Sequence, residues 1–178
     1  MNIKKENLIN KQIILCLMSF FIIIRGPLGC GKSTISEKLA DILKAKYVAM
    51  DRIVDDPNLI IREKEEGYIS QNNFIKANEI AVERIKKHLK NGKPIVFDGN
   101  FYWKSQIEDL ISRLNFPHYV FTLKAPLKVC IERDANRTKT HGKMAAMVVH
   151  KKSTEFDYGT LIDVTKPLKE CLNKIISY

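Results

Sequence analysis

The feature that most constrains this chain is a glycine-rich segment at residues 26–34, with the sequence GPLGCGKST. It follows directly on the apolar run FFIII at residues 20–24, and an amphipathic helix pattern comes after it. The segment matches G-x-x-x-x-G-K-[ST], the Walker A or P-loop, which links a buried strand to a helix and holds phosphate groups with its backbone amides. A glycine-rich turn without a ligand is the alternative, but a lysine that faces converging amides needs an anion.

Each position of this loop has a physical role. The glycines allow positive φ angles and keep side chains away from the phosphates. The lysine neutralises the β- and γ-phosphates, and the serine hydroxyl can bind Mg²⁺. The sequence therefore predicts binding of ATP and Mg²⁺. The predicted nucleotide-binding residues are Gly26, Pro27, Leu28, Gly29, Cys30, Gly31, Lys32, Ser33 and Thr34, and Ser33 is also a predicted metal ligand.

The length and charge of the chain bear on its partners. A chain of 178 residues can bury the core of one domain, with little left for a second. The formal net charge of +10 raises the question of a polyanionic partner. However, lysines such as Lys86, Lys87 and Lys90 are scattered over predicted helix faces, which favours an ordinary solvated surface. Nucleic acid stays open as a partner, but a small molecule is favoured.

The cysteine pattern indicates the redox compartment. Cys16, Cys30, Cys130 and Cys171 form no C-x-x-C pair, which favours reduced cytosolic thiols over a zinc site or a disulfide scaffold. Cys30 lies in the phosphate loop, where helix N-terminal amides could lower its pKa. The simpler interpretation is a small residue at a variable loop position.

An apolar run at residues 13–24 follows several lysines and resembles part of a signal peptide. The run is short for a membrane span, and it merges into the strand that presents the phosphate loop. We therefore expect a cytoplasmic protein with no membrane partner. Residues 1–19 are interpreted as an N-terminal extension, and residues 20–178 as a single domain.

Strand and helix signals alternate along the rest of the chain. Strands are expected at residues 46–50, 94–97, 119–123 and 161–164, and helices at 74–89, at about 107–114, around Arg133 and Arg137, and after Pro167. Residues 52–73 are expected to be irregular. Repeated β-α units predict an α/β domain in which helices cover both faces of a parallel sheet.

Three segments resemble one known family. GPLGCGKST, VFDGN from Val96 and LKAPLKVCIERDANR from Leu123 to Arg137 resemble the small P-loop kinases. That group includes gluconate, shikimate, adenylate and polynucleotide kinases and zeta-toxin-like phosphotransferases, and this chain is most similar to AAA-type ATP-binding kinases. The resemblance implies a three-layer α/β/α P-loop NTPase fold with a parallel five-stranded sheet of order 2-3-1-4-5. It also implies a small lid at about residues 133–150.

Two acidic residues gain roles from this arrangement. Asp98, at the end of the third strand, is placed like the acid that holds the Mg²⁺ shell; capping a turn with Gly99 is the alternative. Asp51, at the end of the second strand, could orient or deprotonate an acceptor hydroxyl. A helix N-cap or an ion pair with Arg52 is the alternative for Asp51.

Arg133 and Arg137 are four residues apart and are expected on one face of a lid helix. The planar guanidinium suits a phosphate that is losing its leaving group, and Asp134 is expected to tether one of these cations. A solvated basic helix is the alternative. The predicted catalytic residues are Lys32, Asp51, Arg133 and Arg137.

Weaker candidates for the acceptor cleft are Asn72, Asn73, Asn78, Glu79, Asn100, Tyr102 and Trp103, each of which is more readily explained as scaffold or surface.

The favoured function is transfer of the γ-phosphate of ATP to a hydroxyl of a small molecule. A polynucleotide 5′-hydroxyl kinase and a nucleotide-binding regulatory ATPase are the alternatives. Adenylate kinases carry an arginine shortly after the Asp-Gly pair, but residues 100–103 after Asp98-Gly99 include none, which weakens the hypothesis of a nucleoside-monophosphate kinase. We expect a monomer or a homodimer.

Overall fold

Five parallel strands form the centre of the computed structural model, which describes residues 19–58 and 62–178. The N-terminal extension predicted at residues 1–19 lies almost wholly outside the described residues. The strands are β1 (Phe21–Arg25), β2 (Lys46–Ala49), β5 (Ile95–Asp98), β6 (His118–Lys124) and β7 (Thr160–Asp163). They lie in the order β2-β5-β1-β6-β7, and every neighbouring pair is parallel.

Counted along the chain, these five strands have the order 2-3-1-4-5, so the predicted fold is confirmed. The labels differ because a separate hairpin, β3 (Lys64–Glu65) and β4 (Tyr68–Ile69), precedes the third strand of the sheet. This hairpin lies in the stretch that was expected to be irregular. Gly67, with φ +82°, makes the tight turn between its two strands.

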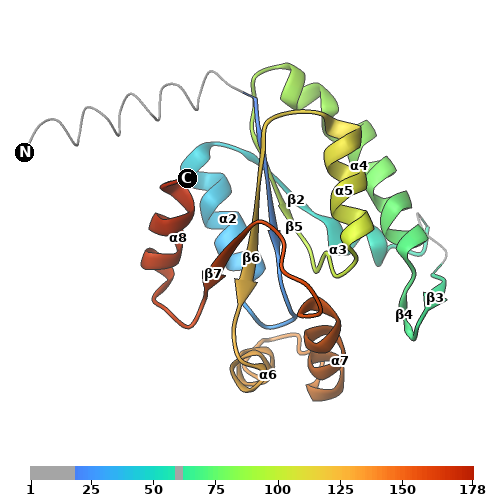
Figure 1. Ribbon diagram of the computed structural model, residues 1–178, viewed down its shortest axis with the longest axis vertical. Helices are drawn as coiled ribbons and strands as arrows, with labels where there is room; N and C mark the ends of the chain where they lie inside the picture. The colour runs from blue at the N-terminus through green and yellow to red at the C-terminus, as the bar shows by residue number, and fades with distance from the viewer. Residues whose placement is uncertain (1–18, 59–61) are drawn as a thin grey trace, which may run out of the picture.

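Helices cover both faces of the sheet (Figure 1). One face carries α2 (Lys32–Leu43) and α8 (Leu168–Ile176), and the other carries α4 (Gln71–Lys90) and α5 (Lys104–Leu114). The side chains of β1 alternate between two hydrophobic clusters: Phe21 and Ile23 pack on the α4–α5 side, and Ile22 and Ile24 pack on the α2–α8 side. Each such burial contributes roughly 1.5–3 kcal/mol before entropy is counted.

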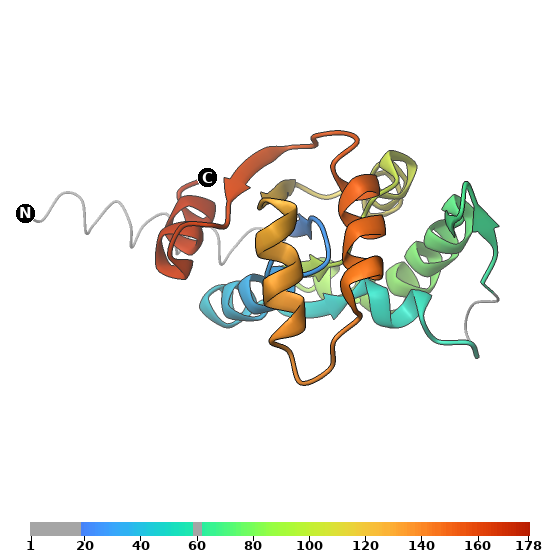
Figure 2. The same ribbon diagram turned by 90° about the horizontal axis from the view of Figure 1, so that it is seen from below.

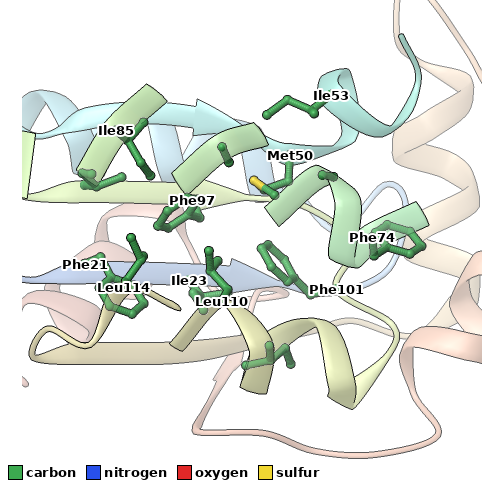
Figure 3. Packing of buried hydrophobic residues seen from close by; sticks show 14 of the residues in the cluster. Phe21, Ile23, Met50, Ile53, Phe74, Ile85, Phe97, Phe101, Leu110 and Leu114 are labelled. Carbon is green, nitrogen blue, oxygen red and sulfur yellow. The ribbon is translucent and has the colours of Figure 1, made fainter. Parts of the chain in front are cut away.

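The larger cluster reaches the carboxyl ends of the strands (Figure 3). Met50, from the short helix α3 (Met50–Val54), packs there with Phe74, Phe97 and Phe101, and all four side chains are buried. These contacts fix the start of α3 and the end of β5. The backbone at Asp51 and at Asp98 is therefore held by the core.

Two further helices, α6 (Leu127–Ala135) and α7 (Lys143–Ser153), cross the carboxyl edge of the sheet. Figure 2 shows them on either side of the loop that follows β1. The prediction that Arg133 and Arg137 share one helix is wrong, because α6 ends at Ala135 and Arg137 lies in the turn beyond it. The buried carboxylate of Asp134 accepts hydrogen bonds from Thr140 Oγ1, His141 N and Gly142 N, which turns the chain back toward α7.

A buried arginine ties α7 to the sheet. Arg25, at the end of β1, is fully buried and donates hydrogen bonds to the carbonyls of Phe101, Ser153 and Phe156 and to Thr122 Oγ1. Its guanidinium also lies 4.2 Å from the centre of the Phe156 ring. The C-terminal end of α7 is therefore anchored at the same point as β1.

Within residues 19–58 and 62–178, no helix combines the length and the apolar character needed to cross a membrane.

Candidate active site

The phosphate loop joins β1 to α2, and its backbone forms a cradle, the curved conformation that surrounds a bound phosphate. Gly29 and Gly31 have φ angles of +82° and +89°. A Cβ atom on Gly29 would lie 2.1 Å from the carbonyl oxygen of Cys130, so the loop can pack against α6 only with glycine there. A Cβ on Gly31 would meet nothing within 4 Å, because the N-terminus of α2 faces open space. The first turn of α2 has no side-chain cap and no acidic residue, so its amides are available to an anion.

Lys32 supplies a buried positive charge beside this cradle. Its side chain is only 6% exposed, and Nζ donates to the carbonyl of Pro27 at 3.1 Å and to Asn100 Oδ1 at 3.0 Å. Both acceptors are neutral, and within the described chain no carboxylate lies within ion-pair distance of Nζ. A buried ammonium without a counter-ion is costly unless an anion binds beside it. Phosphate groups are anions of the required charge.

Asp98 and Ser33, the two predicted metal-site residues, both line the larger of two cavities at the phosphate loop. Asp98, at the end of β5, is buried, and its Oδ2 accepts a hydrogen bond of 2.8 Å from the Tyr47 hydroxyl. The same hydroxyl also interacts with the Ser33 side chain, so Tyr47 links the two predicted metal-site residues. Asp98 Oδ1 is buried with no hydrogen-bond partner in the described chain, and it does not cap the turn at Gly99. A free carboxylate oxygen near a hydroxyl suits the hydrated shell of Mg²⁺.

The metal role of Asp98 predicts a specific defect. Replacement of Asp98 by asparagine should raise the Mg²⁺ concentration needed for half-maximal activity about tenfold to a hundredfold, because a carboxylate that accepts hydrogen bonds from the metal's water ligands orients them. Titration of initial rates with MgCl₂ at saturating ATP measures this. An unchanged Mg²⁺ requirement would assign Asp98 a structural role instead.

Asp51 lies in the first turn of α3, two residues beyond the end of β2 and not at the strand end itself. Its Oδ1 accepts the backbone N–H of Asn100 at 3.1 Å, so Asn100 bridges Asp51 and Lys32. No ion pair joins it to Arg52 in the described chain, and the N-cap of α3 is Ala49. Burial, with smaller contributions from Asp98 and Asp55, raises the pKa of Asp51 to about 6, although Lys32 and the Asn100 amide oppose the shift. Such a carboxylate can accept a proton near neutral pH.

Two cavities meet at the phosphate loop. The smaller, of about 300 Å³, is lined by Gly29, Gly31 and Thr34 of the loop and by the segment after β7 that contains Val164 and Leu168. The larger, of about 970 Å³, contains Lys32, Ser33, Asp51, Asp98 and Asn100. The loop thus lines a small, partly apolar cavity on one side and a large cavity with the acidic residues on the other.

The two predicted lid arginines occupy different places. Arg133 lines the smaller cavity, and its Nη2 donates to the carbonyl of Val164 at 2.9 Å. Arg137 is exposed and lines both cavities. Asp134 forms no ion pair with either arginine in the described chain, so the expected tether is wrong. Asp134 instead shapes the turn that carries Arg137, and its hydrogen bonds from Thr140, His141 and Gly142 lower its pKa even though burial acts to raise it.

This arrangement predicts that the two arginines contribute to different steps. Replacement of Arg137 by lysine should lower kcat about tenfold or more, because Arg137 lines both cavities and lysine lacks the two-point fork that arginine offers to a phosphoryl group. The matched change in Arg133 should mainly weaken nucleotide binding. Single-turnover transfer and ATP binding without acceptor, measured on both variants, separate these effects. Wild-type transfer by the Arg137 variant would exclude its proposed role.

The weaker candidates are mostly structural. Asn78 donates to the carbonyl of Gln106 and to Asp109, and Glu79 pairs with Arg113, so both join α4 to α5. Asn72, Asn73 and Trp103 do not line the larger cavity, whereas Asn100 and Tyr102 do. Burial raises the pKa of the Cys30 thiol, which is the opposite of the lowered pKa that a redox-sensitive cysteine would need. Sequence reasoning missed Tyr47, although its place one strand away from Asp98 follows from the sheet order.

Three features define a nucleotide-binding protein with a P-loop kinase fold: a glycine-rich cradle, a buried lysine that pairs with no carboxylate of the described chain, and acidic residues at and just beyond the carboxyl ends of parallel strands. The comparisons agree. This chain belongs to the AAA domain family, whose model matches residues 21–156.

Solved structures show the same fold. A gluconokinase from Sinorhizobium meliloti 1021 matches with a TM-score of 0.70 and 19% identity over 90% of this chain and 91% of its own. A sugar kinase from Janibacter sp. HTCC2649 matches with a TM-score of 0.72 and 14% identity, and the match covers 90% of this chain and 94% of the sugar kinase chain. No curated protein sequence matches the chain.

Proposed function

We propose that this protein is an ATP-dependent phosphotransferase that moves the γ-phosphate to an alcohol hydroxyl of a small molecule. The observation that carries the proposal is the pair of cavities that share the phosphate loop, with the buried Lys32 ammonium between the loop and Asn100. A nucleotide with its base in the smaller cavity would present its γ-phosphate toward Asp51. The kinase names of the similar structures are consistent with this function.

The reaction assigns a role to each group. The acceptor oxygen forms a bond to the γ-phosphorus, and the bond between that phosphorus and the bridging β–γ oxygen breaks, so that ADP leaves with the electron pair. Asp51 accepts the hydroxyl proton. Lys32 and Arg137 offset charge on the phosphoryl oxygens. Mg²⁺, held through Ser33 and the water shell at Asp98, would neutralise charge on the β- and γ-phosphates.

The larger cavity favours this reaction over a purely regulatory ATPase. A switch protein needs a site for nucleotide and γ-phosphate only, whereas here a cavity of about 970 Å³ that includes Lys32 also contains Asp51, a carboxylate with a raised pKa. A cavity of this size holds a second small molecule.

The test is an acceptor screen with γ-labelled ATP over sugars, sugar acids, nucleosides, ring alcohols and 5′-hydroxyl oligonucleotides. The proposal expects label in a stable phosphate ester of one small-molecule class. Transfer to oligonucleotides that falls steeply with salt would instead support a polynucleotide kinase. Hydrolysis to inorganic phosphate with every acceptor would favour a regulatory ATPase.

A further inference from the structure

We propose that the acceptor is an alcohol whose body is an aromatic ring, and not an open polyol or sugar acid. The proposal rests on the proposed function and names the substrate class of the same site. It comes from the composition of the cavity walls beyond Asp51, where apolar and aromatic side chains gather on two sides.

The first wall is aromatic. Tyr68 of β4, Phe74 of α4 and Tyr102 after β5 all line the larger cavity, together with Ile69. The rings of Phe74 and Tyr102 lie 5.0 Å apart at 77°, and those of Tyr68 and Tyr102 lie 6.0 Å apart at 56°. Phe74 and Tyr102 are buried, so the half-buried Tyr68 presents most of this aromatic wall to the cavity. Aromatic groups prefer tilted and edge-to-face contacts, and a further ring can contact Tyr68 in that geometry.

This aromatic wall is held rigidly in place. The Tyr102 hydroxyl accepts the backbone N–H of Ile69, and Trp103 Nε1 donates to the Ile69 carbonyl. The ammonium of the buried Lys152 lies 3.9 Å from the centre of the Trp103 ring and 5.2 Å from that of Tyr68. The Tyr102 ring is therefore fixed against β4, and its hydroxyl oxygen already accepts one hydrogen bond.

The second wall is one face of α7. Met144, Ala145, Val148 and Val149 recur at helical spacing and all line the larger cavity. Met144 is 71% exposed and Val148 is 44% exposed, although both are apolar. Water at these side chains is unfavourable, and a ligand with an apolar body would displace it. A polyol would leave its hydroxyls unpaired against this face.

The polar groups of the cavity lie at its reacting end, along α3 and in the turn before α7. Lys32, Asp51 and Asp98 occupy the reacting end, and on the α3 side Arg62 is already paired with Asp55. Arg137, Lys139 and His141 lie in the turn before α7. The two apolar walls suit a molecule with one hydroxyl at Asp51 and a ring beside them. The same chemistry occurs in a simple aryl alcohol and in a nucleoside, whose base is joined to a sugar hydroxyl.

Four purified acceptors with γ-labelled ATP test the proposal: benzyl alcohol, adenosine, gluconate and glycerol. Transfer to benzyl alcohol or to adenosine at a kcat/KM at least tenfold above gluconate and glycerol supports it, and the better of the two identifies the source of the ring. Preferential transfer to gluconate or glycerol overturns the aromatic acceptor while leaving the kinase function intact. If ATP is only hydrolysed with all four acceptors and with every acceptor of the wider screen, both the aromatic acceptor and the kinase function are overturned.

A matched pair of variants on α7 locates the effect. Met144→Gln should raise KM for the preferred ring-bearing acceptor roughly tenfold and leave KM for ATP unchanged, because it replaces an apolar cavity contact with an amide. Met147→Gln is the control, since Met147 is 38% exposed on the same helix but does not line the cavity. Equal effects of the two changes on acceptor KM would overturn the assignment of this wall.

Discussion

Replacement of Lys32 by alanine should lower the rate of phosphoryl transfer about a hundredfold to a thousandfold. The Lys32 ammonium is buried and bound only by two neutral oxygens in the described chain, so its charge is available to the phosphates. Inside a site that excludes water, one such charge contributes far more than it would at the surface. Initial rates with γ-labelled ATP and a saturating acceptor measure the effect.

The control for this variant is Lys38→Ala, which removes an exposed lysine from the same helix. That change should leave the rate unaltered. We also expect the melting temperature of Lys32→Ala to be no lower than that of the wild type, because the variant removes a buried charge that has no counter-ion. A Lys32→Ala protein that is folded and turns over normally would disprove the assignment of the phosphate site.

Replacement of Asp51 by asparagine should lower transfer about a hundredfold or more while ATP affinity changes little, since a general base contributes on the order of 10² to 10⁴ in rate. The pKa of Asp51 is about 6, so the wild-type rate should fall as the pH drops below 6 and level off above it. The variant should lose this dependence. A pH–rate profile of both proteins at saturating ATP tests this. If the rate of both proteins falls in the same way near pH 6, Asp51 is not the base.

The stability of the same variant provides an independent check. The carboxyl pKa is raised from 3.8 to about 6 in the folded protein, so ionisation of Asp51 opposes folding. The penalty is absent below about pH 4, develops between pH 4 and 6, and is complete above pH 6. Asp51→Asn should therefore raise the melting temperature at pH 7 and have little effect at pH 4. A lower melting temperature at pH 7 would show that Asp51 is mainly structural.

The sequence was most informative where local backbone chemistry determines the structure. The loop from Gly26 to Thr34 needs particular residues at fixed spacing, so its cradle and the lysine beside it could be predicted from the motif. Asp98 was singled out because the segment VFDGN resembles the P-loop kinases, in which the acid at that position holds the Mg²⁺ shell. The start of α4 was placed three residues late because the Ser70 cap, whose hydroxyl accepts Asn73 N, was overlooked.

Other parts depend on contacts between distant residues and could not be predicted from the sequence. The hydrogen bonds of Arg25 join residues 76 to 131 positions away, and they hold α7 against the sheet. Arg137 was assigned to a helix because four-residue spacing suggested it, but the hydrogen bonds to Asp134 end that helix sooner. The apolar wall of α7 is visible only once the fold places that helix beside the cavity.

The most direct test of the account is the ratio of ADP formed to phosphate ester formed, measured with γ-labelled ATP and the acceptor that the screen selects. Phosphoryl transfer to an alcohol should form one ester for each ADP at saturating acceptor, with both products lost together in Lys32→Ala and only slow hydrolysis when acceptor is omitted. ADP formation at the same rate with and without acceptor, with the label always in inorganic phosphate, would contradict it.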